Sequence, residues 1–256
     1  IEPITAGAGS MEKLYDFELM KGGGRIKGYK LTEAQKDAVA GALQALTSPE
    51  AMEAKYGLKG VAPLLFAVGD GNHSLATAKQ CYEDLKKLTQ KEEWANIPAR
   101  YALVEVVNNH DEALQFEPIH RVVFDCEPEK LLEAFKAAYP GSCEGRGEGH
   151  CIAYCYEGHK GFVTIPDPKF QLAVATLQTF LDEYVKKDDL EVDYIHGDAV
   201  TEELGSRPGN IAFLLPGMGK EQLFKTVMAD GVLPRKTFSM GHAEDKRYYT
   251  EARKIR

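Results

Sequence analysis

A run of chemically versatile residues, Asp70-Gly71-Asn72-His73-Ser74, follows a short apolar segment of the chain. It offers a carboxylate, an amide, an imidazole and a hydroxyl, groups that transfer protons, hold a metal ion or contact phosphate. Apolar residues then recur with the spacing of one helical face, which predicts a helix starting at Ser74 or one residue earlier. Because the first N–H groups of a helix are free, an anion such as phosphate is favoured there. Alternatively, Asp70 and Ser74 only cap the helix, and His73 is a surface imidazole.

Two apolar segments are predicted to be strands that position these groups. Residues 64–68 are too few for a buried helix and follow a proline, which favours a central strand. Residues 100–108 are rich in valine and predict a second strand. The polar residues 108–111 at its end occupy a place where α/β proteins often contact ligands, although a plain turn explains them nearly as well.

Two further candidate sites carry histidine. Residues 116–124 predict a strand with His120 and Arg121, which as neighbours must point to opposite faces of a sheet. His120 is either a structural histidine or a functional one. His196 and Asp198 follow another short strand and are a candidate metal or acid–base pair, with helix capping by Asp198 as the favoured alternative.

A basic segment lies near the C-terminal end. Residues 234–242 present Arg235, Lys236 and Thr237 in an extended run. Two cations and two hydroxyls, the latter from Thr237 and Ser239, make a phosphate or carboxylate site plausible in an acidic chain, because guanidinium and ammonium groups donate charged hydrogen bonds to such anions.

The composition is that of a globular protein, with 256 residues, 44% of them hydrophobic and 27% charged. The net charge of −8 argues against a nucleic-acid partner, because non-specific affinity for phosphate backbones comes from clustered Lys and Arg. No apolar run approaches the roughly 20 residues that cross a bilayer, so we expect a cytoplasmic protein with no membrane partner.

The five cysteines predict reduced thiols. Cys143, His150, Cys151, Cys155 and His159 cluster in the sequence. If Cys151 and Cys155 lie on one strand, however, their sulfurs are about 13 Å apart, too far to share a zinc ion.

Strands alternate with helices over most of the chain, which predicts an α/β or α+β fold with a mixed sheet and flanking helices. We expect residues 1–140 to form one part, carrying the Asp70 turn, and residues 141–256 a second, or the whole chain to be one continuous domain. The helix over residues 172–185 has a wide apolar face that is core or interface, which leaves a homodimer open.

Three motifs resemble the bacterial family known as domain of unknown function 1015. Asp-Gly-Asn-His-Ser-Leu-Ala-Thr-Ala at residues 70–78 resembles its Asp-Gly-His-His-Arg signature, and Pro-Ile-His-Arg-Val-Val at 118–123 its Pro-Thr-His-Arg strand. Leu-Pro-Arg-Lys-Thr-Phe at 233–238 is similar to its near-terminal Met-Pro-Gln-Lys-Ser-Thr segment. Members are usually longer at the N-terminus, and Ile1 is not a start residue, so the resemblance implies the C-terminal part of a larger protein.

The same turn is more remotely similar to one in the ParB/sulfiredoxin superfamily, which includes nucleotide-binding partition proteins and kinases that phosphorylate free serine. That similarity implies a ParB/sulfiredoxin-like core plus a second lobe, with Mg²⁺ and ATP or ADP as cofactors. Asp70 would be the general base or magnesium ligand, alongside His73 and His120 as catalytic residues. The residues implied to hold the cofactor are Gly71, Asn72, Ser74, Arg235, Lys236 and Thr237.

Two substitutions separate this chain from the motif. Asn72 stands in place of the first His and Ser74 in place of the Arg, so a phosphate-binding guanidinium is missing from its usual position. Arg235 and Lys236 are the candidates to supply that charge.

These observations predict a small-molecule phosphotransferase resembling the free-serine kinases, or another nucleotide-dependent enzyme, with a small-molecule substrate. One alternative is a non-catalytic nucleotide- or metabolite-binding module. Another is a metal-dependent hydrolase built from Asp70, His73, His120 and His196.

Overall fold

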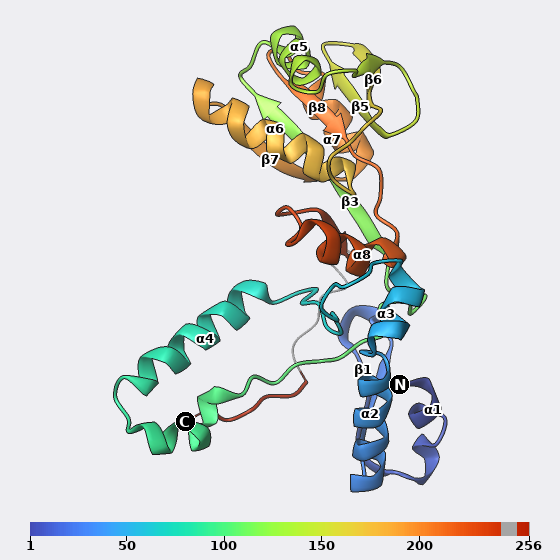
Figure 1. Ribbon diagram of the computed structural model, residues 1–256, viewed down its shortest axis with the longest axis vertical. Coiled ribbons are helices and arrows are strands. Elements are labelled where there is room, and N and C mark those ends of the chain that lie inside the picture. Colours follow the sequence, from blue (N-terminus) through green and yellow to red (C-terminus); the bar gives the residue numbers. More distant parts are fainter. Residues whose placement is uncertain (242–249, 256) are drawn as a thin grey trace. The chain divides into compact units, whose positions relative to one another are not determined.

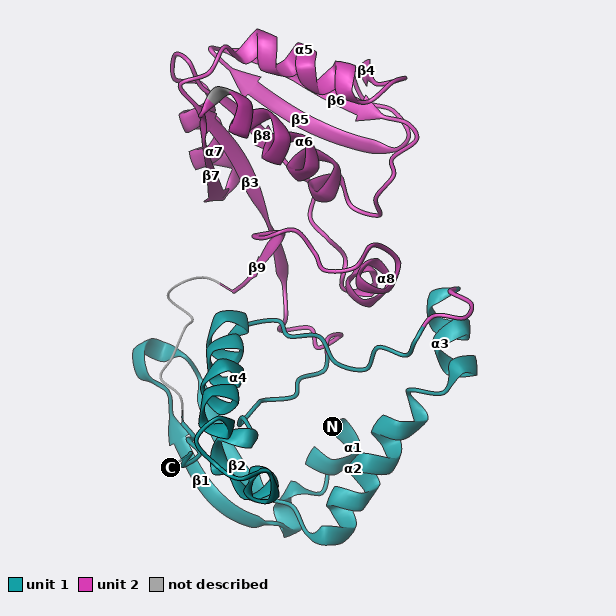
Figure 2. Cartoon of the chain, turned by 60° about the vertical axis from the view of Figure 1, so that its left-hand side comes forward, with its two compact units in different colours: residues 1–57, 62–108, 244–256 teal, residues 58–61, 109–243 magenta. Residues whose placement is uncertain are grey.

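The computed structural model describes residues 1–241 and 250–255, apart from the side chain of Asp188. The chain divides into two compact units (Figure 2). Unit 1 comprises residues 1–57, 62–108 and 244–256, and unit 2 comprises residues 58–61 and 109–243. The boundary expected near residue 140 falls inside unit 2, whereas the Asp70 turn belongs to unit 1.

Unit 1 contains a hairpin and several helices; Figure 1 labels β1 and helices α1 to α4, and Figure 2 labels both strands of the hairpin. The hairpin pairs β1 (Glu12–Glu18) with β2 (Arg25–Lys30) in antiparallel fashion, and the connection between them contains three consecutive glycines, residues 22–24. The α-helices are α1 (Glu2–Thr5), α2 (Glu33–Ala45), α3 (Pro49–Tyr56) and α4 (Asn72–Lys86). Helix α2 begins with a capping box, in which the Gln35 backbone N–H donates to Thr32 Oγ1 at 3.3 Å.

The predictions of strands over residues 64–68 and 100–108 are wrong. Residues 64–68 and 102–108 belong to no strand, and within the described residues no ladder joins them to another segment. Phe66, Val68 and the five large apolar side chains of residues 101–107 are 48–63% exposed. A β-branched pattern gives a segment a preference for a strand, but the strand exists only where a neighbour pairs with its backbone.

Unit 2 is organised on an antiparallel sheet that contains seven strands in the described residues, in the order β4-β6-β5-β8-β3-β7, with β9 also paired to β3. The long strand β3 (Phe116–Phe124) pairs with β7 (Glu191–His196), β8 (Ile211–Leu214) and β9 (Phe238–Met240). Strands β5 (His150–Tyr156) and β6 (His159–Ile165) form an antiparallel hairpin, and β4 (Cys143–Glu144) adds an edge. The strand that carries His120 and Arg121 therefore pairs with three other strands of unit 2.

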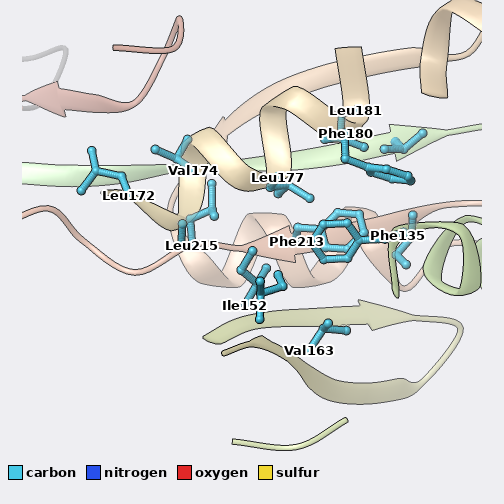
Figure 3. Packing of buried hydrophobic residues seen from close by; sticks show 14 of the residues in the cluster. Phe135, Ile152, Val163, Leu172, Val174, Leu177, Phe180, Leu181, Phe213 and Leu215 are labelled. Atoms are coloured by element: carbon cyan, nitrogen blue, oxygen red, sulfur yellow. The ribbon is translucent and has the colours of Figure 1, made fainter. Parts of the chain in front are cut away.

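Helices cover both faces of this sheet. Helices α5 (Pro128–Ala138) and α6 (Ala173–Asp188) share one apolar cluster with the strands (Figure 3), in which the Phe135 ring lies 5.1 Å from Phe180 and 5.8 Å from Phe213. Helix α7 (Asp198–Gly205) packs on β8 and β3 over a second cluster that includes Val122 and Ala212. Helix α8 (Lys220–Asp230) precedes the basic segment. The predicted α+β class with a helix-flanked sheet is confirmed.

Among the helices in the described part of the chain, none combines the length and apolar character needed to span a bilayer.

Candidate functional site

The Asp70 turn lies in unit 1 and is exposed. Helix α4 begins at Asn72, earlier than its apolar periodicity predicts, and its N-cap is Gly71 in the left-handed conformation (φ +77°), which glycine adopts without strain. Neither Asp70 nor Ser74 caps the helix, because Asp70 Oδ1 accepts only from the adjacent Gly71 N–H at 2.8 Å. In the described residues the backbone N–H groups of Asn72, His73 and Ser74 have no hydrogen-bond partner.

His120 is almost fully buried on the face of β3 that α7 covers. The Leu215 backbone N–H donates to His120 Nδ1 at 3.0 Å, so the proton of the neutral ring sits on Nε2, which donates to Asp198 Oδ1 at 2.8 Å. Burial lowers the pKa of His120, although the bond to Asp198 acts in the opposite direction. Both ring nitrogens are thus engaged, and proton transfer by His120 requires one of these bonds to open.

The favoured capping role of Asp198 is wrong. Asp198 is the first residue of α7, the N-cap is Gly197, and the Asp198 carboxylate contacts His120 instead. His196 does not pair with Asp198 but contacts the Glu117 carboxylate through Nε2.

Arg121, on the opposite face of β3, is completely buried without an ion-pair partner among the described residues. Its Nε donates to Gln178 Oε1 at 3.0 Å, and its terminal nitrogens donate to the carbonyls of Ile119, Lys236 (2.9 Å) and Arg235 (3.0 Å). The guanidinium also lies over the Tyr194 ring, 4.8 Å from its centre. Burial lowers the pKa of Arg121 to about 10.

These bonds fix the backbone of the basic segment. With its carbonyl held by Arg121, Lys236 takes a left-handed conformation at φ +54°, and Thr237 Oγ1 donates to the Pro234 carbonyl at 2.6 Å. The hydroxyl of Thr237 is therefore engaged within the segment. The exposed Arg235 side chain lies 3.4 Å from Asp182 Oδ1 and 5.3 Å from the centre of the Tyr194 ring. Residue 242 of the predicted segment lies outside the described residues.

Arg235 lines a pocket of about 540 Å³ within unit 2, which we call the α6–α8 pocket. One wall is a polar stripe of α6, and the other is the end of α8 with the loop that follows it. Gln178, which receives the Arg121 bond, donates through Nε2 to Asp182 Oδ1 at 2.8 Å. The lining residues are Phe170, Ala175, Gln178, Thr179, Asp182, Lys186, Thr226, Asp230, Gly231, Val232, Leu233, Pro234 and Arg235.

The predicted site residues fall into both units. Asp70, Gly71, Asn72, His73 and Ser74 belong to unit 1, whereas His120, Arg235, Lys236 and Thr237 belong to unit 2. Of the second group, the structure brings only Arg235 to the α6–α8 pocket.

Sequence reasoning missed the other charged and polar residues of this pocket. Gln178, Asp182 and Lys186 recur every four residues along α6, on a different stripe from the apolar Leu177, Phe180 and Leu181. That spacing is the signal that could have found them.

In the described residues, no group of three or more His, Cys, Asp or Glu side chains could hold a metal ion. The role of Asp70 as a single magnesium ligand beside a bound nucleotide stays a prediction. The cysteines are free thiols, and burial raises the pKa of Cys126 to about 11 and also raises that of Cys155.

A family model described as protein of unknown function (DUF1015) matches residues 1–184. The chain therefore belongs to the DUF1015 family, as its three motifs predict. No curated protein matches the chain significantly. The more remote similarity to the ParB/sulfiredoxin superfamily stays a prediction.

Proposed function

We propose that this DUF1015 protein binds a small molecule with an anionic group in the α6–α8 pocket. The observation that carries the proposal is the arrangement of Arg235, whose side chain lines the pocket while its backbone carbonyl is held by the buried Arg121. Because the backbone of Arg235 is already fixed, an anion that binds there orders only the side chain and not the loop, which favours affinity.

Lys186 supports the same proposal from the opposite wall. Lys186 is an exposed residue of the pocket lining, and in the described residues its side chain has no hydrogen bond or ion pair. Two cations that approach one space from α6 and from the basic segment would bind a carboxylate or phosphate with charged hydrogen bonds. The apolar side chains of Phe170, Val232 and Leu233 give the rest of a ligand a surface to cover.

Calorimetry of the full chain with monocarboxylates, inorganic phosphate, ADP and ATP tests the proposal. We expect at least one of these compounds to bind, and Arg235→Gln and Lys186→Gln each to weaken its binding about five- to tenfold. Arg207→Gln and Lys225→Gln are matched controls, because both side chains lie outside the pocket lining. Absence of binding by every compound, or binding that Arg235→Gln leaves unchanged, would contradict the proposal.

We propose phosphoryl transfer to a small hydroxyl-bearing substrate as a second candidate, at the Asp70 turn. Its support is the exposed Asp70 carboxylate directly before the uncapped start of α4, whose N–H groups and helix dipole favour phosphate. In this role Asp70 would hold Mg²⁺ or orient the attacking hydroxyl, and ATP or ADP would be the phosphate donor.

Incubation with ATP or ADP, Mg²⁺ and a panel of hydroxy amino acids tests this second candidate. A phosphorylated product that Asp70→Asn abolishes and Asp37→Asn preserves is the expected result, since Asp37 is an exposed residue of α2. If no product forms and calorimetry detects no nucleotide binding, phosphoryl transfer by this chain is refuted.

A further inference from the structure

The charges that line the α6–α8 pocket are balanced. Lys186 and Arg235 are its cations, and Asp182 and Asp230 are its carboxylates. A ligand with only negative charge would meet two like charges there, and the cost of leaving them unpaired would offset part of its attraction to the cations.

Each carboxylate keeps an oxygen for a ligand. Asp182 uses Oδ1 to accept from Gln178 Nε2 and to approach Arg235, and Asp230 uses Oδ2 to accept from the Gln171 backbone N–H at 2.6 Å. In the described residues the other oxygen of each has no partner. The Asp182 side chain is 46% exposed, and its bond to Gln178, which accepts from the buried Arg121, links it to the core.

We propose that the α6–α8 pocket takes a zwitterionic small molecule, with its anionic carboxylate or phosphate at Lys186 and Arg235 and its ammonium group at Asp182 and Asp230. Asp182 and Lys186 are four residues apart on α6, so their Cα atoms are about 6 Å apart along the helix axis, and the two charged groups start from positions separated by that distance. A short aliphatic chain between the two ligand charges spans that distance and contacts the apolar wall. This inference rests on the proposed binding function and adds the ammonium group to it.

Calorimetry with matched probes tests the inference on the full chain. The ω-amino acids from 4-aminobutanoate to 6-aminohexanoate carry both charges, whereas pentanoate carries the anion alone and pentylamine the cation alone. We expect the best ω-amino acid to bind at least about tenfold more tightly than either single-charge probe, because its ammonium donates charged hydrogen bonds to the carboxylates.

Substitution of the carboxylates supplies the second readout. Asp182→Asn keeps an oxygen for Gln178 but removes the charge, so it should reduce the preference for the ω-amino acid over pentanoate about fivefold or more. Asp230→Asn serves the same purpose without touching the Gln178 network, and Asp167→Asn, outside the pocket, should change nothing.

The outcomes separate this inference from the function on which it rests. If pentanoate or phosphate binds as tightly as every ω-amino acid, the zwitterion is refuted while anion binding stands. If neither the zwitterions nor the anions bind, both proposals fail.

Discussion

Replacing Arg121 by methionine is the sharpest test of the network behind the α6–α8 pocket. Methionine has a similar volume but donates no hydrogen bond, so four acceptors lose the donor that Arg121 supplies. They are Gln178 Oε1 and the carbonyls of Ile119, Arg235 and Lys236. A buried acceptor without a donor costs about 1–3 kcal/mol, so four of them cost about 4–12 kcal/mol.

Relief of the buried charge acts in the opposite direction. The pKa of Arg121, about 10 in the protein, lies about 2.5 below the ordinary value near 12.5, which corresponds to roughly 3 kcal/mol of unfavourable burial. The difference predicts that Arg121→Met lowers the free energy of unfolding by about 1–9 kcal/mol, with a central value near 5 kcal/mol. Lysine at this position keeps the charge but not the planar fork, so Arg121→Lys should be intermediate.

Urea unfolding followed by far-UV circular dichroism measures this loss. Fluorescence is less suitable, because the single tryptophan, Trp94, belongs to unit 1 whereas Arg121 belongs to unit 2. Arg207→Met is the matched control, since its surface pair with Glu203 contributes less than about 1 kcal/mol. An Arg121→Met protein within about 1 kcal/mol of the parent would refute the assignment of Arg121 as the anchor of the basic segment.

Three further predictions concern other parts of the fold. Because burial lowers the pKa of His120, the unfolded chain takes up a proton on this ring at a higher pH than the folded chain does. The urea concentration at the unfolding midpoint should therefore decrease as the pH is lowered from about 7.5 to about 5.5, and it should decrease less in His120→Gln. Parallel pH profiles of the two proteins would contradict this. Gly205→Ala should lower the melting temperature, because the new Cβ would lie 2.4 Å from the Cβ of Ala212, and such overpacking costs about 1–3 kcal/mol. Its control, Gly41→Ala, should be neutral or stabilising, because the new Cβ meets no atom within 4 Å. Hydrogen exchange should be fast for amides 102–107 and slow for β3, and protection of the former would reveal pairing that this structure lacks.

The local elements were largely predictable because their signals lie within a few residues. The capping box of Thr32 and Gln35, the end of α3 at Gly57 and the bounds of β3 all follow from short patterns. The strand predictions for residues 64–68 and 100–108 are wrong for a different reason. Their apolar residues favour a strand, but a strand also needs a second segment to pair with, and the sequence of one segment does not reveal whether such a neighbour is present.

The candidate sites show the same limit at the level of side chains. Adjacency in β3 correctly placed His120 and Arg121 on opposite faces of the sheet. It did not reveal that His120 is engaged through both ring nitrogens, or that the guanidinium of Arg121 reaches carbonyls more than a hundred residues later in the chain. The family resemblance selected His120, of these two adjacent residues, as the catalytic one. The hydrogen bonds show that Arg121 is the one that holds the segment carrying Arg235 of the α6–α8 pocket.

One wall of the α6–α8 pocket could have been predicted from the sequence, but only the apolar face of α6 was considered and its polar residues were overlooked. A helix that buries Leu177 and Leu181 must present another stripe to its surroundings, and here that stripe carries Gln178, Asp182 and Lys186 at helical spacing. What no spacing could supply is the opposite wall, because Arg235 is brought there by the Arg121 bonds across the core. Polar residues at regular spacing on a core helix therefore become candidate ligand contacts only when a second element is anchored over them.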